Sequence, residues 1–144
     1  MMEPTDKTMI TVRTTINAPA DLVWKCWTSP EDILCWNTAS ADWHTTKAEN
    51  KLEAGAQFNY RMEAKDGSFG FDFWGIYDQV IAQQVLEITL GDERKMKVIF
   101  KSGNGMTEVV ETFEAESENS VELQKLGWQA ILDNYKKYVE NINL

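Results

Sequence analysis

The chain has 144 residues, a length typical of one domain, and its 43% apolar and 26% charged residues exclude a disordered or collagen-like chain. Acidic residues (23) outnumber basic ones (14), and the resulting net charge of −9 argues against nucleic acid and anionic membranes as partners. No apolar run is long enough to span a membrane and no secretory signal precedes the first elements, so we expect a soluble, cytoplasmic protein.

The first quarter of the chain predicts one strand and two short helices. Apolar and polar residues alternate over 9–16, which is typical of a half-buried strand, and Pro19 ends it. A helix is expected over 20–27, and a second one from Pro30 to about Trp36, with Ser29 at its cap position. Residues 1–8 are expected to form a flexible tail.

The middle of the chain predicts an antiparallel meander. Alternating patterns indicate strands near 58–63, 69–77, 86–90, 96–100 and 107–113, and a weaker strand near 43–49. Asp66-Gly67 and Asn104-Gly105 are typical hairpin turns. Because tight turns join consecutive strands, we expect these strands to pair in chain order.

The last quarter changes to a helical period. Between about 120 and 142, residues recur at spacings of three and four that place them on one helix face: Leu123, Leu126, Gly127, Ala130, Ile131, Tyr135, Tyr138 and Ile142. The predicted fold is therefore a single α+β domain over 1–144. A curved antiparallel sheet of about six to seven strands wraps around the long C-terminal helix, with two short helices after the first strand.

Aromatic residues are the main candidates for a binding site between this sheet and the helix. Strand residues two apart share a face, and the face with most aromatic side chains should turn toward the helix. Gly75 on the sheet and Gly127 on the helix are expected to leave space there. The residues predicted to line a cavity are Phe58, Tyr60, Phe71, Phe73, Gly75, Tyr77, Val109, Glu111, Trp128 and Tyr135.

Ordinary core packing is the alternative interpretation for most of these aromatic residues. Large apolar walls with a few polar groups are nevertheless what a ligand pocket needs. Four tryptophans, at positions 24, 27, 36 and 43, lie around the short helices that are expected to rim the cavity entrance.

Glu111 is the one charged residue predicted to face the cavity, because it shares a strand face with Val109 and Phe113. A buried carboxylate must find a partner, raise its pKa or face water. It is therefore a candidate to orient a polar ligand group or to act as a general base. The alternative is a structural carboxylate paired with a Lys or a Tyr.

The histidine and the two cysteines do not form a pattern typical of nucleophilic, redox or metal chemistry. His44, the only histidine, has no acidic or thiol cluster nearby in the sequence and is expected to be an exposed strand residue. Cys26 and Cys35 lack the spacing of a redox or zinc pair, so we expect two buried, unlinked thiols. We predict no metal, no cofactor and no catalytic residues.

Short motifs run in a fixed order from about residue 9 to 142. The chain thereby resembles the START-like (SRPBCC, helix-grip) superfamily and, within it, the Activator of Hsp90 ATPase homolog 1-like family. This resemblance implies a helix-grip fold with an apolar cavity. The motifs that carry it are Ala18-Pro19, Val23-Trp24, Trp27-Thr28, Pro30-Glu31, Asp66-Gly67, Gly75-Ile76-Tyr77 and Gly127-Trp128.

The superfamily includes lipid and polyketide binders, cyclases and chaperone-docking domains, so three functions stay open. The first is a binding module for a small apolar or amphipathic molecule, acting as a monomer or weak homodimer. The second is an interaction module for a chaperone such as Hsp90, linked to the stress response. The third is a cyclase- or hydrolase-like enzyme that uses Glu111, Tyr60 or His44.

Overall fold

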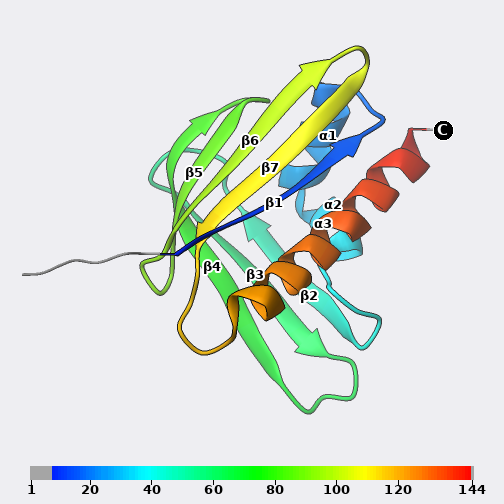
Figure 1. The fold of residues 1–144 in the computed structure, drawn as a ribbon. Helices are drawn as coiled ribbons and strands as arrows, with labels where there is room; N and C mark the ends of the chain where they lie inside the picture. The colour runs from blue at the N-terminus through cyan, green and yellow to red at the C-terminus, as the bar shows by residue number, and fades with distance from the viewer. Residues whose placement is uncertain (1–7, 144) are drawn as a thin grey trace, which may run out of the picture.

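The computed structural model describes residues 8–143, so the expected N-terminal tail lies, apart from Thr8, outside the described residues. Seven strands and three helices follow one another along the chain (Figure 1). They are β1 (Met9–Ile16), α1 (Ala20–Thr28), α2 (Pro30–Trp36), β2 (Trp43–Asn50), β3 (Gln57–Ala64), β4 (Gly70–Ile81), β5 (Val85–Leu90), β6 (Lys95–Gly103), β7 (Met106–Glu114) and α3 (Val121–Ile142).

All seven strands belong to one antiparallel sheet with the order β1-β7-β6-β5-β4-β3-β2. β2 to β7 form the predicted meander, and β1 pairs with β7, with Met9 opposite Glu114 and Ile16 opposite Thr107. The sheet is curled, and α3 lies across it from the end of β7 toward the short helices (Figure 1). The predicted α+β helix-grip fold is confirmed.

Local turn chemistry explains why the strands pair in chain order. Asn104 and Gly105 both have positive φ angles, of 55° and 77°, which suit the tight turn between β6 and β7. At the β5–β6 turn, a Cβ on Gly91 would lie only 2.4 Å from the Trp74 ring. Glycine is therefore required there by the close approach of an aromatic side chain.

The buried face of α3 differs from the predicted face. Leu132, Tyr135 and Val139 are fully buried at spacings of three and four, whereas Leu123 and Leu126 are 57% and 68% exposed. Ile131 is only half-buried. The predicted face is wrong for both leucines and for Ile142, which is 47% exposed, because the buried side of α3 runs through Gln124, Leu132, Tyr135 and Val139 instead.

A buried carboxylate ties the three helices together. Asp32 of α2 is 4% exposed, accepts a hydrogen bond from the Tyr138 hydroxyl of α3 and pairs with Lys25 of α1 at 2.9 Å. The rings of Trp27, Trp36 and Tyr135 also meet here, with centroids 4.8 to 5.1 Å apart. α1 and α2 thus close one end of the space between α3 and the sheet.

Both cysteines are free thiols. Cys26 is buried as predicted, but Cys35 is exposed, because it lies on the side of α2 opposite the buried Asp32, Ile33 and Trp36. Within residues 8–143 we find no helix with the length and apolar character needed to cross a membrane.

Candidate ligand-binding site

A cavity of about 520 Å³ lies between the curled sheet and α3. This volume is within the range of pockets that hold small molecules. Its wall receives side chains from all three helices and from six of the seven strands or their turns. Nine aromatic residues contribute to it: Trp27, Trp36, Trp43, Phe58, Tyr60, Phe71, Phe73, Tyr77 and Trp128.

Seven of the ten predicted residues lie on this wall: Phe58, Tyr60, Phe71, Phe73, Tyr77, Glu111 and Trp128. The register of β3 and β4 explains why the aromatic residues come together. Tyr60 lies opposite Phe73, and residues two apart on each strand share that face. The rings of Phe58 and Tyr77 have centroids 5.4 Å apart, and those of Phe73 and Trp128 are 5.9 Å apart.

Val109 and Tyr135 do not line the cavity, although both were predicted to do so. Val109 pairs with Phe100, whose ring packs edge-on against Trp27 of α1. α1 therefore covers this end of β7 and buries Val109 completely. Tyr135 lies behind the wall, where its hydroxyl donates to the Val23 carbonyl.

Gly75 does not leave space on the sheet. A Cβ at this position would lie 2.9 Å from the Thr89 carbonyl oxygen and 3.0 Å from both Phe58 and Ile88, so the interior is already dense there. Gly127 behaves as predicted, since it lines the cavity and a Cβ on it would meet nothing within 4 Å. Of the two glycines predicted to leave space in the cavity, only Gly127 of the helix does so.

Part of the cavity wall was not predicted, namely the residues that β5, β6 and further positions of β3 and α3 add to it. Of the four tryptophans expected at the entrance, Trp27, Trp36 and Trp43 line the cavity, whereas Trp24 packs edge-on against Phe100. Met62 shares a strand face with two predicted residues, so alternation alone could have identified it. The other missed wall residues include Ile88, Met96, Gln124 and Ile131.

Glu111 is the most unusual group on the wall. Its side chain is 4% exposed, and its cross-strand neighbours are Val12 and Val98. Among residues 8–143, no side chain or backbone group forms a hydrogen bond or ion pair with its carboxyl, so the alternative of a Lys or Tyr partner finds no support in this part of the chain. Burial raises the pKa of Glu111 to about 8, which leaves the carboxyl mostly protonated at pH 7.

Two buried tyrosines on the cavity wall, Tyr60 of β3 and Tyr77 of β4, belong to one polar network. The Tyr60 hydroxyl donates to that of Tyr77, which donates to Asn50 Oδ1 at 2.6 Å. Asn50 in turn donates to the Thr28 carbonyl at 2.8 Å. Burial raises the pKa of Tyr77 to about 12 and that of Tyr60 well above its usual value, so both phenols stay neutral.

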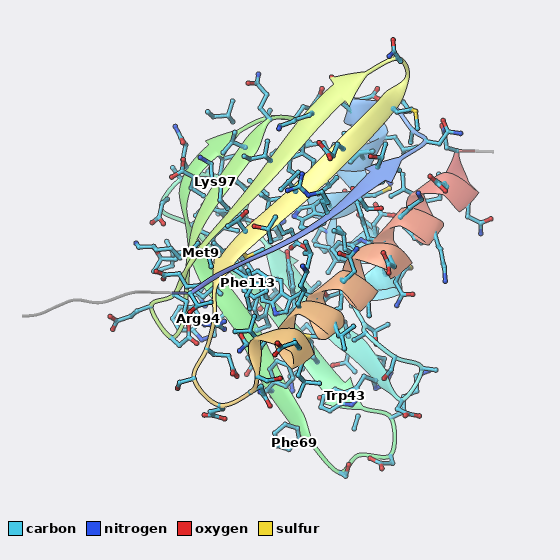
Figure 2. The ribbon with its side chains drawn as sticks, viewed as in Figure 1. Met9, Trp43, Phe69, Arg94, Lys97 and Phe113 are labelled. Carbon is cyan, nitrogen blue, oxygen red and sulfur yellow. The ribbon has the colours of Figure 1, made fainter. Side chains whose placement is uncertain are left out.

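Charged residues at the β5–β6 and β7–α3 turns are already engaged. Arg94 donates to Asp92 Oδ2 at 2.7 Å and to the Glu114 carbonyl at 3.0 Å. Glu116 accepts the backbone N–H groups of Glu118 and Asn119, and the Asn119 hydrogen bonds lower its pKa. Figure 2 shows Arg94 at this end of the sheet, and both Arg94 and Glu116 lie on the cavity wall.

The wall contains no paired acid and base of the kind used in hydrolysis. His44 is exposed on β2 and is not part of the cavity. The residues that the structure describes contain no group of three or more His, Cys, Asp or Glu side chains placed to hold a metal ion. Apart from the engaged Arg94 and Glu116 and several neutral polar side chains, the wall offers one buried carboxyl, two neutral phenols and many aromatic faces.

Residues 17–140 match the family model described as Activator of Hsp90 ATPase homolog 1-like protein. The chain belongs to this family. Its AHSA1-like fold is consistent with the wider START-like superfamily. A search of curated proteins found no match.

Solved structures of similar proteins support the same assignment. An AHSA1-like protein from Aeromonas hydrophila is 43% identical, with a TM-score of 0.88 and 94% of each chain covered. A protein from Cytophaga hutchinsonii is 46% identical, with a TM-score of 0.80 and 93% of each chain covered. A protein from Nitrosomonas europaea shares the fold at 16% identity, with a TM-score of 0.77 over 94% of this chain and 96% of that one.

Proposed function

We propose that this AHSA1-like chain binds a small apolar or amphipathic molecule in the cavity between the sheet and α3. The observation that carries the proposal is the cavity of about 520 Å³ with nine aromatic residues and few polar groups on its wall. Ligand pockets combine such walls with a small number of polar groups that fix orientation. A cytoplasmic location, expected from the sequence, is part of this proposal.

A dye that fluoresces in apolar surroundings tests this function. We expect uncharged 1-anilinonaphthalene to bind with a saturable rise in fluorescence and Gly127→Leu to weaken this binding at least tenfold. Gly127 shares a helix face with Gln124, Trp128 and Ile131, all on the wall, so the added isobutyl group enters the cavity. Thermal unfolding should stay cooperative, because replacing a helical glycine gains up to about 1 kcal/mol.

Gly127→Ala is the matched control. It removes the same helical glycine but adds only one methyl group, so dye binding should stay within about twofold of the unchanged chain while the melting temperature rises. Equal dye binding by the Leu variant and the unchanged chain would show that the dye does not enter this cavity. Absence of saturable dye binding would reject the proposed function.

An exposed aromatic patch supports a second candidate, docking on a chaperone such as Hsp90. Trp43, Phe69 and Phe71 have ring centroids 5.9 to 6.5 Å apart, and Phe69 is 63% exposed. Figure 2 shows Trp43 and Phe69 at the free end of the β3–β4 hairpin. Phe69→Ser should then abolish capture by purified Hsp90 and leave dye binding unchanged. The third candidate, a cyclase- or hydrolase-like enzyme, lacks a second catalytic group beside Glu111.

A further inference from the structure

Three charged residues line the cavity, and Glu111 alone among them has no partner within the described chain. Arg94 is paired with Asp92, and Glu116 is engaged by backbone N–H groups. Glu111 instead projects from the middle of β7 into an apolar part of the sheet, between Val12 and Val98. Glu111 is 4% exposed and lies on the cavity wall, so a molecule in the cavity can supply the polar partner that a buried carboxyl needs.

Aromatic faces lie around this carboxyl. Trp128 stacks on Phe113 with centroids 3.7 Å apart, and Phe113 is the next residue on the same face of β7 as Glu111. Trp27 and Trp36 line the cavity from the short helices. The negative face of an aromatic ring attracts cations, and this attraction is strongest where water is excluded.

We propose that the ligand's polar group is a protonated amine that pairs with the Glu111 carboxylate while its apolar body packs on the aromatic wall. This inference rests on the proposed function, since it names the class of molecule that the cavity takes. An ammonium group carries up to three N–H donors, which can satisfy both carboxylate oxygens. An anionic ligand would be repelled by the ionised form of the carboxyl, and a purely apolar one would leave the carboxyl without a partner.

The nearest polar groups do not compete for this role. The Tyr135 hydroxyl, on α3, interacts electrostatically with Glu111 but already donates to the Val23 carbonyl. Tyr60 and Tyr77 use their hydroxyl protons within their own network. Glu111 is therefore the cavity group that is left to recognise a cation.

Proton balance makes the proposal specific. At pH 7 the Glu111 carboxyl is mostly protonated, because burial raises its pKa to about 8. An incoming ammonium group pairs with the carboxylate, so the carboxyl proton must leave to solvent and binding should release close to one proton per ligand. As the fraction of ionised carboxyl rises, affinity should increase about tenfold between pH 6 and 7 and about fivefold between pH 7 and 8, where the pH reaches the pKa.

No other group facing Glu111 titrates in this range. Burial raises the pKa of Tyr135 and Tyr60 well above the usual value, that of Tyr77 to about 12 and that of Cys26, on α1, to about 11. Elsewhere on the wall, hydrogen bonds from Asn119 lower the pKa of Glu116, and Arg94 stays charged because a guanidinium does not lose its proton in proteins. The facing positions of β1 and β6 are valines.

Titration calorimetry with probes of one shape tests the inference on the full chain. The probes are 1-naphthylmethylamine, neutral 1-naphthylmethanol, 1-acetonaphthone as a neutral acceptor and anionic 1-naphthoate. At pH 7.5 we expect the amine to bind at least tenfold more tightly than the alcohol and the naphthoate more weakly than both. Measurements at pH 7 in buffers of different ionisation enthalpy should show release of close to one proton on amine binding.

Glu111→Gln is the decisive variant, because its amide keeps the size of the side chain but cannot become an anion. The amine should lose its advantage of at least tenfold, while the alcohol keeps its affinity. Glu108→Gln removes the same charge from the same strand but outside the cavity, and should change neither value.

Three results would overturn the inference. They are equal affinities for amine and alcohol, an amine advantage that survives Glu111→Gln, and a preference for the ketone without proton release. In each case 1-anilinonaphthalene would still bind, so the cavity proposal would stand. If neither the dye nor any naphthyl probe binds, the proposed function fails and this inference fails with it.

Discussion

Glu111→Gln is expected to remove most of the loss of stability that this protein suffers between pH 5 and pH 9. Folding raises the pKa of Glu111 from an ordinary value near 4.5 to about 8, because burial disfavours the charged carboxylate. Between these values the folded chain holds a proton that the unfolded chain has lost. Stability contributed at this position is thus present at low pH and falls as the pH rises from about 4.5 to 8.

This shift corresponds to a difference of up to about 4 kcal/mol in the free energy of unfolding between pH 5 and pH 9. The measurement is urea unfolding of both chains across this range, with the difference between them compared at each pH. Glu108→Gln is the control, since Glu108 is partly exposed on the same strand and pairs with Arg13 only at 4.0 Å. Parallel pH profiles for Glu111→Gln and the unchanged chain would show that the carboxyl is not buried in solution.

Leu132→Ala is expected to lower the free energy of unfolding by about 3 kcal/mol, because it leaves a cavity in a close-packed core. Leu132 is fully buried between α3 and the sheet, with Tyr135 and Val139 buried at the following turns of the helix. Chemical denaturation gives the value directly, provided that the slope against denaturant concentration is unchanged.

Ile131→Ala is the matched control on the adjacent residue of α3. Ile131 is half-buried and lines the cavity, so part of its surface has no close-packed neighbours to lose. Its truncation should cost less than half of the Leu132→Ala value and should enlarge the cavity. A larger loss for Ile131→Ala than for Leu132→Ala would mean that the core-facing side of α3 had been assigned wrongly.

Features set by neighbouring residues along the chain were predictable from the sequence. Alternation of apolar and polar residues predicted the strands, and the Asn104-Gly105 turn has the positive φ angles that its residue types favour. The same alternation placed Phe58, Tyr60 and Glu111 on the face that lines the cavity. These predictions held because side-chain direction in a strand repeats every two residues, whatever packs against it.

Boundaries between elements were harder to predict than their existence. The strand expected over 69–77 begins at Gly70 and continues to Ile81, past an irregularity in its pairing with β5 between Tyr77 and Gln79. The apolar face of α3 was also predicted with an error. A helix turns about 100° per residue, so the difference between Ile131 and Leu132 decides which side chain faces the cavity and which the core.

The amino-acid sequence alone determined the chain-order pairing of the meander strands, the long helix and the sheet face that carries the aromatic residues, but not the pairing of β1 with β7. Only the tertiary structure decided where on that face the cavity ends, because α1 covers Val109 and the dense contacts of Phe58 and Ile88 fill the space around Gly75. It also decided that Glu111 has no partner in the described chain. A carboxyl finds a partner only if another element brings one within reach, and no local pattern along the sequence records which elements meet.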